Sequence, residues 1–325
     1  MKVLIIRFSS LGDVILTSSV FLPLKEAGIE IDLLTLKPWG EIFKNDSRLS
    51  KVVEVEKKEV KTLQGLKKLA KKLNENRYDY IFDLHNNLRS RILSLFLEAR
   101  VFRYKKSSLL RRLMLIFKPF KSKWLFVPQL YAETFKKIGI EIKNPRPSIP
   151  LSQQEVSKIF PLIPQKPFIV IAPGAKWEGK RYPVKKFAEI SRLLNKKGFS
   201  VAVVGGKEDY HLGEKISENS NAVNLCGKLT LRESLAVISQ AKGAISNDSA
   251  VVHMARAVKT PVAVIFGPTH PAFGFAPAPD EGIVITKNLP CSPCSLHGKT
   301  ECKRKECFNI TPEVVVENLM KIVKP

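Results

Sequence analysis

The stretch Lys2-Val-Leu-Ile-Ile-Arg-Phe-Ser-Ser-Leu-Gly-Asp13-Val-Ile-Leu-Thr17 decides the fold that we expect for this chain. Its apolar run predicts a buried parallel strand over Val3–Phe8, and the apolar pattern that follows predicts a helix over Val14–Glu26. Gly12 permits the sharp turn between the two elements. Asp13 is then held at a helix start, at the carboxyl end of the first strand, where open α/β sheets bind ligands. The alternative role for this carboxylate is an N-cap that accepts the free N–H groups of the helix.

Strand-like and helix-like stretches alternate along the chain, which predicts βαβ units and parallel sheets. The predicted strands are Val3–Phe8, Ile31–Thr35, Val52–Val55, Tyr80–Leu84, Phe168–Ala172, Ser200–Val204, Gly243–Ser246 and Val262–Phe266. The predicted helices are Val14–Glu26, Thr62–Glu75, Val184–Lys197, His211–Asn219, Thr230–Gln240, Ser249–Val258 and Thr311–Ile322.

The stretch Asn144-Pro-Arg-Pro-Ser-Ile-Pro150 interrupts this alternation. Its three prolines exclude a helix or a central strand, so it is expected to be a linker. We therefore expect an α/β protein of two Rossmann-like domains, residues 1–150 and 151–325, with parallel sheets facing a central cleft. The last helix could also pack back on the first domain.

Composition and charge narrow the class of protein. The chain has 325 residues, 44% hydrophobic and 26% charged, which is typical of globular domains rather than disordered segments. No apolar run approaches the roughly 20 residues that span a bilayer, and the N-terminus lacks a secretion signal, so a cytoplasmic protein is expected. The net charge is +24, of which residues 1–150 carry +15 (30 Lys+Arg minus 15 Asp+Glu). Nucleic acid, an anionic membrane or a phosphorylated substrate would all fit this charge; a merely solvated surface is the alternative.

Two strand-to-helix loops of the second half carry groups suited to phosphate and ribose. The loop Ala172–Pro183 combines two glycines with Lys176, Lys180 and Arg181, and such a loop suits a diphosphate. Glu208 follows two glycines at a strand end, where a carboxylate commonly holds a ribose diol. The alternatives are a solvated basic loop and a plain turn.

A third loop follows the predicted strand Gly243–Ser246. The N–H groups of Ser249 and Ala250 could bind a phosphate, whereas Asp248 would repel one and is better suited to a sugar hydroxyl. His253, one turn into the helix, is either a site residue or a structural histidine. The turn after the last strand brings two further polar residues to the expected cleft, Thr269 and His270.

Four cysteines lie within 17 residues of the C-terminal part, in the pattern Cys291-x2-Cys294-x7-Cys302-x4-Cys307. This spacing could hold a structural, tetrahedral Zn²⁺, and disulfides are the rival explanation. Either a zinc ion or disulfides would cross-link this loop and would have no catalytic role. Cys226 stands apart and is expected to be a buried thiol.

The segment Arg100 to Lys123 holds nine Lys or Arg residues and no acid, with seven large apolar residues between Leu109 and Phe117. A basic amphipathic segment of this kind can lie on an anionic membrane. It could equally pack its apolar residues into the core and leave its charges in water.

Several motifs are absent. The chain has no GxGxxG, P-loop, HExxH or DxD, which counts against a standard NAD site and against a metal-dependent sugar-nucleotide enzyme. The charge of a diphosphate would then be met by Lys, Arg and helix N-termini. RNP-type motifs and zinc-finger spacing are also missing, which disfavours a nucleic-acid partner.

Taken together, these stretches resemble glycosyltransferase family 9, the ADP-heptose:lipopolysaccharide heptosyltransferases, over nearly the whole chain. The Cys-Ser-Pro-Cys294 stretch is similar to the second-heptose branch of that family. The segments that carry the resemblance are Arg7–Asp13, Pro173–Ala175 with Lys180–Pro183, Asn247–His253 and Gly267–His270.

The resemblance implies a GT-B fold and inverting, metal-independent transfer that requires no cofactor. It implies that the first domain binds a phosphorylated lipid A-core acceptor and the second binds ADP-heptose. The basic first domain suits a phosphorylated lipid acceptor on the inner leaflet, so we expect a monomer that is peripheral to the inner face of the cytoplasmic membrane and in contact with its anionic leaflet. A nucleotide-sugar epimerase of the same fold and a basic nucleic-acid-binding protein are the alternatives.

Motif matching also implies site roles. Asp13 would be the general base, with Ser9, Ser10 and Gly12 beside it in the cleft. Lys180 would contact the diphosphate and Glu208 the ribose. The remaining donor-site residues would be Lys176, Leu229 at the adenine, Asp248 at heptose hydroxyls, Ser249 and Ala250 at the phosphates, and His253 supporting their loop. The family usually has glycine where this chain has Ala250, which puts the choice of donor in question.

Overall fold

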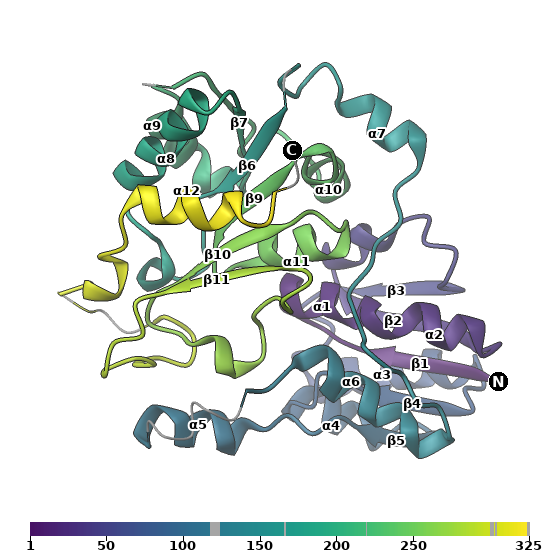
Figure 1. Cartoon of the computed structure of the whole chain (residues 1–325). Coiled ribbons are helices and arrows are strands. Elements are labelled where there is room, and N and C mark those ends of the chain that lie inside the picture. Colours follow the sequence, from purple (N-terminus) through teal and green to yellow (C-terminus); the bar gives the residue numbers. More distant parts are fainter. Residues whose placement is uncertain (118–123, 166, 219, 300–301, 303, 324–325) are drawn as a thin grey trace. The chain divides into compact units, whose positions relative to one another are not determined.

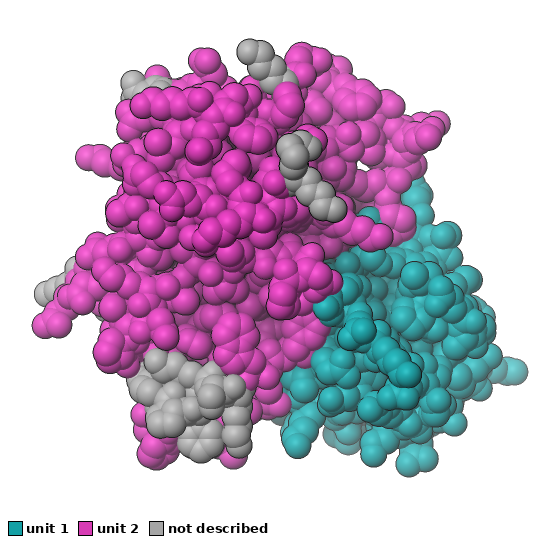
Figure 2. All heavy atoms as spheres, in the orientation of Figure 1, with its two compact units in different colours: residues 1–106, 127–149 teal, residues 107–126, 150–325 magenta. Residues whose placement is uncertain are grey.

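The computed structural model describes residues 1–117, 124–165, 167–218, 220–299, 302 and 304–323. The chain divides into two compact units (Figure 2). Unit 1 comprises residues 1–106 and 127–149, and unit 2 comprises residues 107–126 and 150–325. The break at 149/150 falls in the proline-rich stretch that was expected to be a linker. Residues 107–126, which were expected in the first domain, group with unit 2 instead.

Unit 1 is built on a parallel sheet of order β3-β2-β1-β4-β5. Because side chains of β1 and β2 are buried on both faces, the sheet needs helices on both sides, as parallel sheets generally do. On one side, the apolar stripe of α3 (Leu66, Leu69, Ala70 and Leu73) packs on Leu4, Ile6 and Leu34 of the sheet. The strands are β1 (Lys2–Ile6), β2 (Glu30–Leu36), β3 (Lys51–Val55), β4 (Tyr80–Asp83) and β5 (Arg100–Arg103), and the helices are α1 (Leu11–Thr17), α2 (Phe21–Glu26), α3 (Leu63–Asn74), α4 (Leu88–Ser94) and α6 (Val127–Phe135).

Unit 2 is built on a parallel sheet of order β11-β10-β9-β6-β7-β8. Its core joins buried side chains of β6, β7, β9 and β10 to those of α8 and α12. The strands are β6 (Phe168–Ala172), β7 (Ser200–Val203), β8 (Ala222–Asn224), β9 (Gly243–Asn247), β10 (Val262–Phe266) and β11 (Gly282–Thr286), and the helices are α5 (Ser108–Ile116), α7 (Gln153–Ile159), α8 (Val184–Lys196), α9 (Tyr210–Ser217), α10 (Leu231–Gln240), α11 (Ala250–Ala257) and α12 (Pro312–Met320). Among the described residues, no helix has both the length and the apolar character needed to cross a membrane.

The expected α/β class, with two Rossmann-like halves, is confirmed (Figure 1). One expected helix is interrupted: the helix expected over Val14–Glu26 is α1, a 3-10 turn over Ser18–Val20, and α2. The last helix, α12, packs on α8 and on β9 to β11 of its own unit, with Val315, Val316 and Leu319 buried there.

Candidate functional site

The site of unit 2 is fixed by its topology. From β6 the chain runs to β7 and β8 on one side, and then returns to build β9, β10 and β11 on the other side. The order therefore reverses between β6 and β9, and ligands of open α/β sheets bind outside the carboxyl ends of the strands at such a switch point. The loops that leave this point are residues 173–183 and residues 248–249.

Asn247, the last residue of β9, ties the two loops together. Its side chain is fully buried, its Nδ2 donates to the Pro173 carbonyl at 2.7 Å, and its Oδ1 accepts the Tyr182 N–H at 3.0 Å. Both ends of the basic loop are thereby anchored beside the next residue, Asp248. The sequence showed Asn247 only as part of a motif and did not reveal this role.

Lys180, Asp248 and Thr269 form a charged cluster at the switch point. Asp248 Oδ2 accepts from Lys180 Nζ at 2.6 Å and from Thr269 Oγ1 at 2.8 Å. Burial alone would raise the pKa of Asp248, but the Lys180 ammonium, its hydrogen bond and that of Thr269 outweigh burial and lower this pKa. Asp248 is therefore a carboxylate at neutral pH, and it holds the Lys180 ammonium in place.

Two acids follow β7, and they differ in burial. Glu208 is exposed and folds its carboxylate back over Gly206. Asp209 is buried, accepts the Gly206 N–H at 3.1 Å, and fills the space that a side chain at Gly174 would need. Burial, as the main cause, raises the pKa of Asp209. Asp209 therefore packs the loops together, while Glu208 is the acid accessible to a ligand.

The other expected donor-site residues lie on the same loops or close to them. Ser249 is the N-cap of α11 and Ala250 is its first residue, so the alanine methyl does not prevent the helix from starting there. His253 is buried, with Nδ1 3.3 Å from Arg256 Nη1, and its charge also favours ionised Asp248. Lys176 is exposed, and its ammonium lies over the Trp177 ring. Leu229, which precedes α10, is half-buried. His270 is buried, and its Nδ1 accepts the Ala272 N–H at 3.1 Å.

In unit 1 the sheet order reverses between β1 and β4, and Asp13 lies just past the end of β1. It is not an N-cap: Ser10 is the N-cap of α1, and Asp13 is the third residue of the helix. Its Oδ2 accepts from the Ser10 N–H at 3.2 Å and from Ser10 Oγ at 2.9 Å. Ser9 is half-buried and Gly12 is buried at the turn.

Arg7 holds the other oxygen of the Asp13 carboxylate. Arg7 Nη2 lies 2.7 Å from Asp13 Oδ1, and the side chains are 6% and 19% exposed, respectively. Burial alone would lower the pKa of Arg7, but Asp13 and two neighbouring tyrosines raise it. The carboxylate of Asp13 is therefore fixed by Arg7 and Ser10, while its side chain stays 19% exposed.

His85, which sequence reasoning missed, lies at the carboxyl end of β4, on the other side of the same switch point. It is buried, its ring meets Phe8 edge-on at 5.4 Å, and within the described residues its Nδ1 has no hydrogen-bond partner. Burial and then the charge of Arg7 lower its pKa to about 3, against the opposing effect of Asp13. Nothing in the local sequence Asp83-Leu-His85 distinguishes this residue from a core histidine.

In wild type, His85 is expected to lower the free energy of unfolding by about 2 kcal/mol as pH falls from about 7.5 to about 5. Replacing His85 with glutamine is expected to remove this loss. Because the folded-state pKa of His85 is depressed to about 3, the neutral ring stabilises the fold above its unfolded pKa of about 6.5. That stability is lost as pH falls, since the unfolded chain takes up the proton first. Urea unfolding of wild type and variant at both pH values measures the effect, with His211→Gln on the exposed surface of α9 as control. An unchanged pH dependence would show that His85 is not buried as a neutral ring.

Comparison with known proteins shows the family of this chain. The family model described as glycosyltransferase family 9 (heptosyltransferase) matches residues 66–305. The chain belongs to glycosyltransferase family 9. It is 26% identical to lipooligosaccharide heptosyltransferase 2 of Haemophilus influenzae, with 99% of each chain covered. Solved structures of similar fold include the E. coli ADP-heptose lps heptosyltransferase II (TM-score 0.75, 22% identity, 99% and 98% covered) and a family 9 glycosyltransferase of Veillonella parvula (TM-score 0.80, 17% identity, 99% and 97% covered).

This family 9 glycosyltransferase is therefore an enzyme with a GT-B fold, as its motifs indicated. The family model begins at residue 66, within α3, so the Asp13 segment lies outside the matched range. The alignment with the H. influenzae relative covers 99% of the chain and so extends beyond this range.

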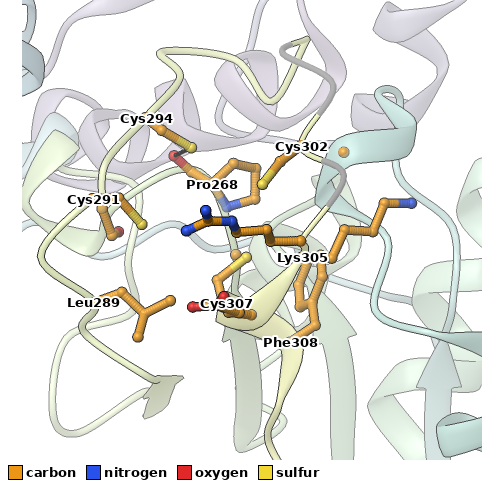
Figure 3. A pocket seen from close by; sticks show the side chains of 13 residues that line it. Pro268, Leu289, Cys291, Cys294, Cys302, Lys305, Cys307 and Phe308 are labelled. Atoms are coloured by element: carbon orange, nitrogen blue, oxygen red, sulfur yellow. Dashed lines mark hydrogen bonds between the residues drawn. The ribbon is translucent and has the colours of Figure 1, made fainter.

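The C-terminal loop of the family 9 enzyme gathers its four clustered cysteines around one cavity of about 190 Å³ (Figure 3). Burial and the neighbouring thiols raise the pKa of Cys307 to about 11. None of the five cysteines forms a disulfide in the structure, and Cys226 is buried as expected. The part of the chain that the structure describes contains no group of three or more His, Cys, Asp or Glu placed to hold a metal ion. A zinc ion bound by Cys291, Cys294, Cys302 and Cys307 thus stays a prediction.

Proposed function

We propose that this glycosyltransferase moves heptose from ADP-heptose to the inner core of lipopolysaccharide, with inversion at the anomeric carbon. Membership of family 9 and similarity to the lipooligosaccharide heptosyltransferase of H. influenzae support the donor and acceptor classes. The observation that carries the mechanism is the Arg7–Asp13 pair, which fixes an ionised, partly exposed carboxylate at the switch point of unit 1.

In the proposed reaction, Asp13 removes the proton from an acceptor hydroxyl. That oxygen forms a bond to the anomeric carbon while the bond from this carbon to the diphosphate oxygen breaks on the opposite face, and ADP leaves. Lys180, with the N–H groups of Ser249 and Ala250, would stabilise the departing diphosphate. The chain lacks the paired acids that hold a catalytic metal, so we propose that no metal takes part; turnover should then persist in the presence of a chelator.

The remaining ligand contacts follow the two units. In unit 2, Glu208 would bind the ribose, Asp248 the heptose hydroxyls and Leu229 the adenine, while Lys176 would add positive charge near the diphosphate. Thr269, His253 and His270 would position these groups. In unit 1, Ser9, Ser10 and the unpartnered Nδ1 of His85 would face the acceptor sugar. We thus propose that unit 1 binds the acceptor and unit 2 binds the donor.

The test is incubation with ADP-heptose and heptose-free core lipid, read by mass spectrometry. The expected product is core lipid heavier by one heptose residue, with release of ADP. Incubation of ADP-heptose without acceptor distinguishes the nucleotide-sugar epimerase: an isomerised donor and no transfer would support that alternative. Release of free heptose alone, with both acceptor and donor present, would count against a lipopolysaccharide acceptor.

We propose that the loop carrying Cys291, Cys294, Cys302 and Cys307 is structural and supports the donor site. The N–H groups of Cys294 and Ser295 donate to the Pro268 carbonyl at 3.0 and 3.1 Å, and Gly298 packs against the stem of Lys180. A structural zinc would require the four sulfurs to draw closer around it. Elemental analysis of the purified protein decides this point: stoichiometric zinc that is lost in Cys291→Ser but kept in Cys226→Ser would establish it, and folded, metal-free protein would exclude it.

A further inference from the structure

Helix α5 packs one of its faces against the rest of unit 2. Met114 is fully buried against Ala272 and Phe273, and Leu110 and Leu115 pack beside it. Arg111 Nε donates to the Phe273 carbonyl at 3.0 Å, and its guanidinium lies over the Phe275 ring. The inward face of α5 thus makes both apolar contacts and a hydrogen bond. These contacts explain why α5, labelled in Figure 1, groups with unit 2.

The opposite face of α5 is apolar as well, but it is exposed. Leu109, Arg112 and Ile116 share this face at helical spacing, and the two aliphatic side chains are each 70% exposed. Trp124, after the helix, is 59% exposed. Two large aliphatic side chains exposed on one helix face, in a segment that also exposes a tryptophan, indicate an interaction surface.

The charge along this segment of the sequence has one sign. Residues 99–132 contain no Asp or Glu, while residues 100–123 contain nine Lys or Arg. Arg112 is exposed on the same face of α5 as Leu109 and Ile116. A helix face with exposed apolar side chains, in a segment that carries only cations, complements a surface that is anionic outside and apolar inside, which is the chemistry of an anionic bilayer. A protein partner would offer acids at fixed points and would not need apolar side chains to insert.

We propose that the outward face of α5, formed by Leu109, Arg112 and Ile116 together with Trp124, inserts into the headgroup region of an anionic phospholipid bilayer. Tryptophan prefers that region, because its ring is apolar and its N–H is polar. The proposal rests on the proposed function, since it names the membrane as the place where a lipid-linked acceptor is met.

The surface is connected to the donor cluster within unit 2. The Trp124 ring lies 6.5 Å from that of His270, the Leu125 N–H donates to the Ala272 carbonyl at 3.1 Å, and Thr269 binds Asp248. Membrane contact through α5 would therefore orient the loop that carries Thr269 with respect to the bilayer. This arrangement suits an enzyme whose acceptor does not leave the membrane.

The proposal is tested by co-sedimentation of the full chain with vesicles of phosphatidylcholine alone or mixed with phosphatidylglycerol. Binding is expected only to the anionic vesicles, and it should weaken as salt is raised. The double variant Leu109→Ser/Ile116→Ser is expected to lower the vesicle partition coefficient by about tenfold or more, because two aliphatic side chains no longer insert. Leu95→Ser, at a leucine of unit 1 that is 77% exposed, is the matched control and should bind like wild type.

No substrate is present in this assay, so its outcome is independent of the sugar that is transferred. Vesicle binding that is equal in the double variant and wild type would overturn the proposal, as would equal binding to neutral vesicles. Heptosyl transfer to a de-acylated, water-soluble acceptor should be unchanged in the double variant. If that transfer fails in wild type as well while vesicle binding is normal, the proposed function fails and the docking surface stands.

Discussion

Asp13→Asn is expected to lower heptosyl transfer by about 10²–10⁴-fold, the usual contribution of a positioned general base. The amide keeps the size of the side chain and still accepts from Ser10, but it does not take up the proton of the acceptor hydroxyl. Turnover measured by ADP release, with saturating donor and acceptor, gives the effect directly. The affinity for ADP should not change, because the proposed donor residues all lie in unit 2.

The variant also removes the charge that faces Arg7, whose side chain is 6% exposed, and an unpaired buried cation destabilises a fold. Unit 1 offers a matched control. Asp46 and Arg48 form a second buried pair, 2.5 Å apart and with side chains 0% and 9% exposed. Asp46→Asn should destabilise unit 1 in the same way but leave turnover per folded molecule nearly normal. If both variants lose turnover equally, loss of the ion pair rather than loss of the base explains the result.

The positions of most strands could be predicted from the sequence because those strands are apolar on both faces. Stretches such as Phe168–Ala172 and Val262–Phe266 match β6 and β10 residue for residue, since a fully buried strand leaves a continuous apolar run. Three strands were missed: β5 begins and ends with arginine, β8 has three residues, and β11 is buried at only one of its five positions. The segment Arg100 to Lys123 left two explanations open, membrane contact and core packing; Met114 is buried as core packing predicts, whereas Leu109 is exposed.

The candidate site was predictable where a motif follows a strand, and not where contacts cross between loops. Asp13 and Lys180 each follow a glycine shortly after a strand, and Asp248 directly follows the strand β9. By contrast, the pairing of Lys180 with Asp248 joins residues 68 positions apart, and Asn247 anchors a carbonyl 74 positions away. His85 carries no local signal, because its importance comes from the strand order that sets β4 beside β1. The alternative interpretation of Asp13 as an N-cap is wrong, because Ser10, three residues earlier, caps the helix.

Lys180→Met is the second variant with a large expected effect: kcat/KM for ADP-heptose should fall by about 10²–10³-fold, as when one preorganised donor to a leaving oxyanion is removed. The methionine keeps the apolar stem that packs on Gly298 and removes only the ammonium. Lys176→Met is the matched control in the same loop, because Lys176 is exposed and lies 5.6 Å from the Trp177 ring centroid. Its effect should be much smaller. Equal losses in the two variants would indicate a general charge effect in place of a specific contact.

The Lys180–Asp248 ion pair makes a sharper test possible, because it separates the two proposed roles. Without a ligand, Asp248 Oδ2 holds the Lys180 ammonium at 2.6 Å, so a diphosphate must compete with this carboxylate for the cation. Asp248→Asn removes the carboxylate charge that competes for Lys180 and repels the diphosphate. ADP should therefore bind at least as tightly as in wild type. ADP-heptose should bind more weakly, since a charge-assisted hydrogen bond to a sugar hydroxyl is lost. Calorimetry with ADP and with ADP-heptose, on Asp248→Asn, Lys180→Met and the double variant, measures both roles and their coupling. Weaker binding of ADP to Asp248→Asn would contradict this assignment, and would mean that Asp248 positions Lys180 for the phosphates rather than holding the sugar.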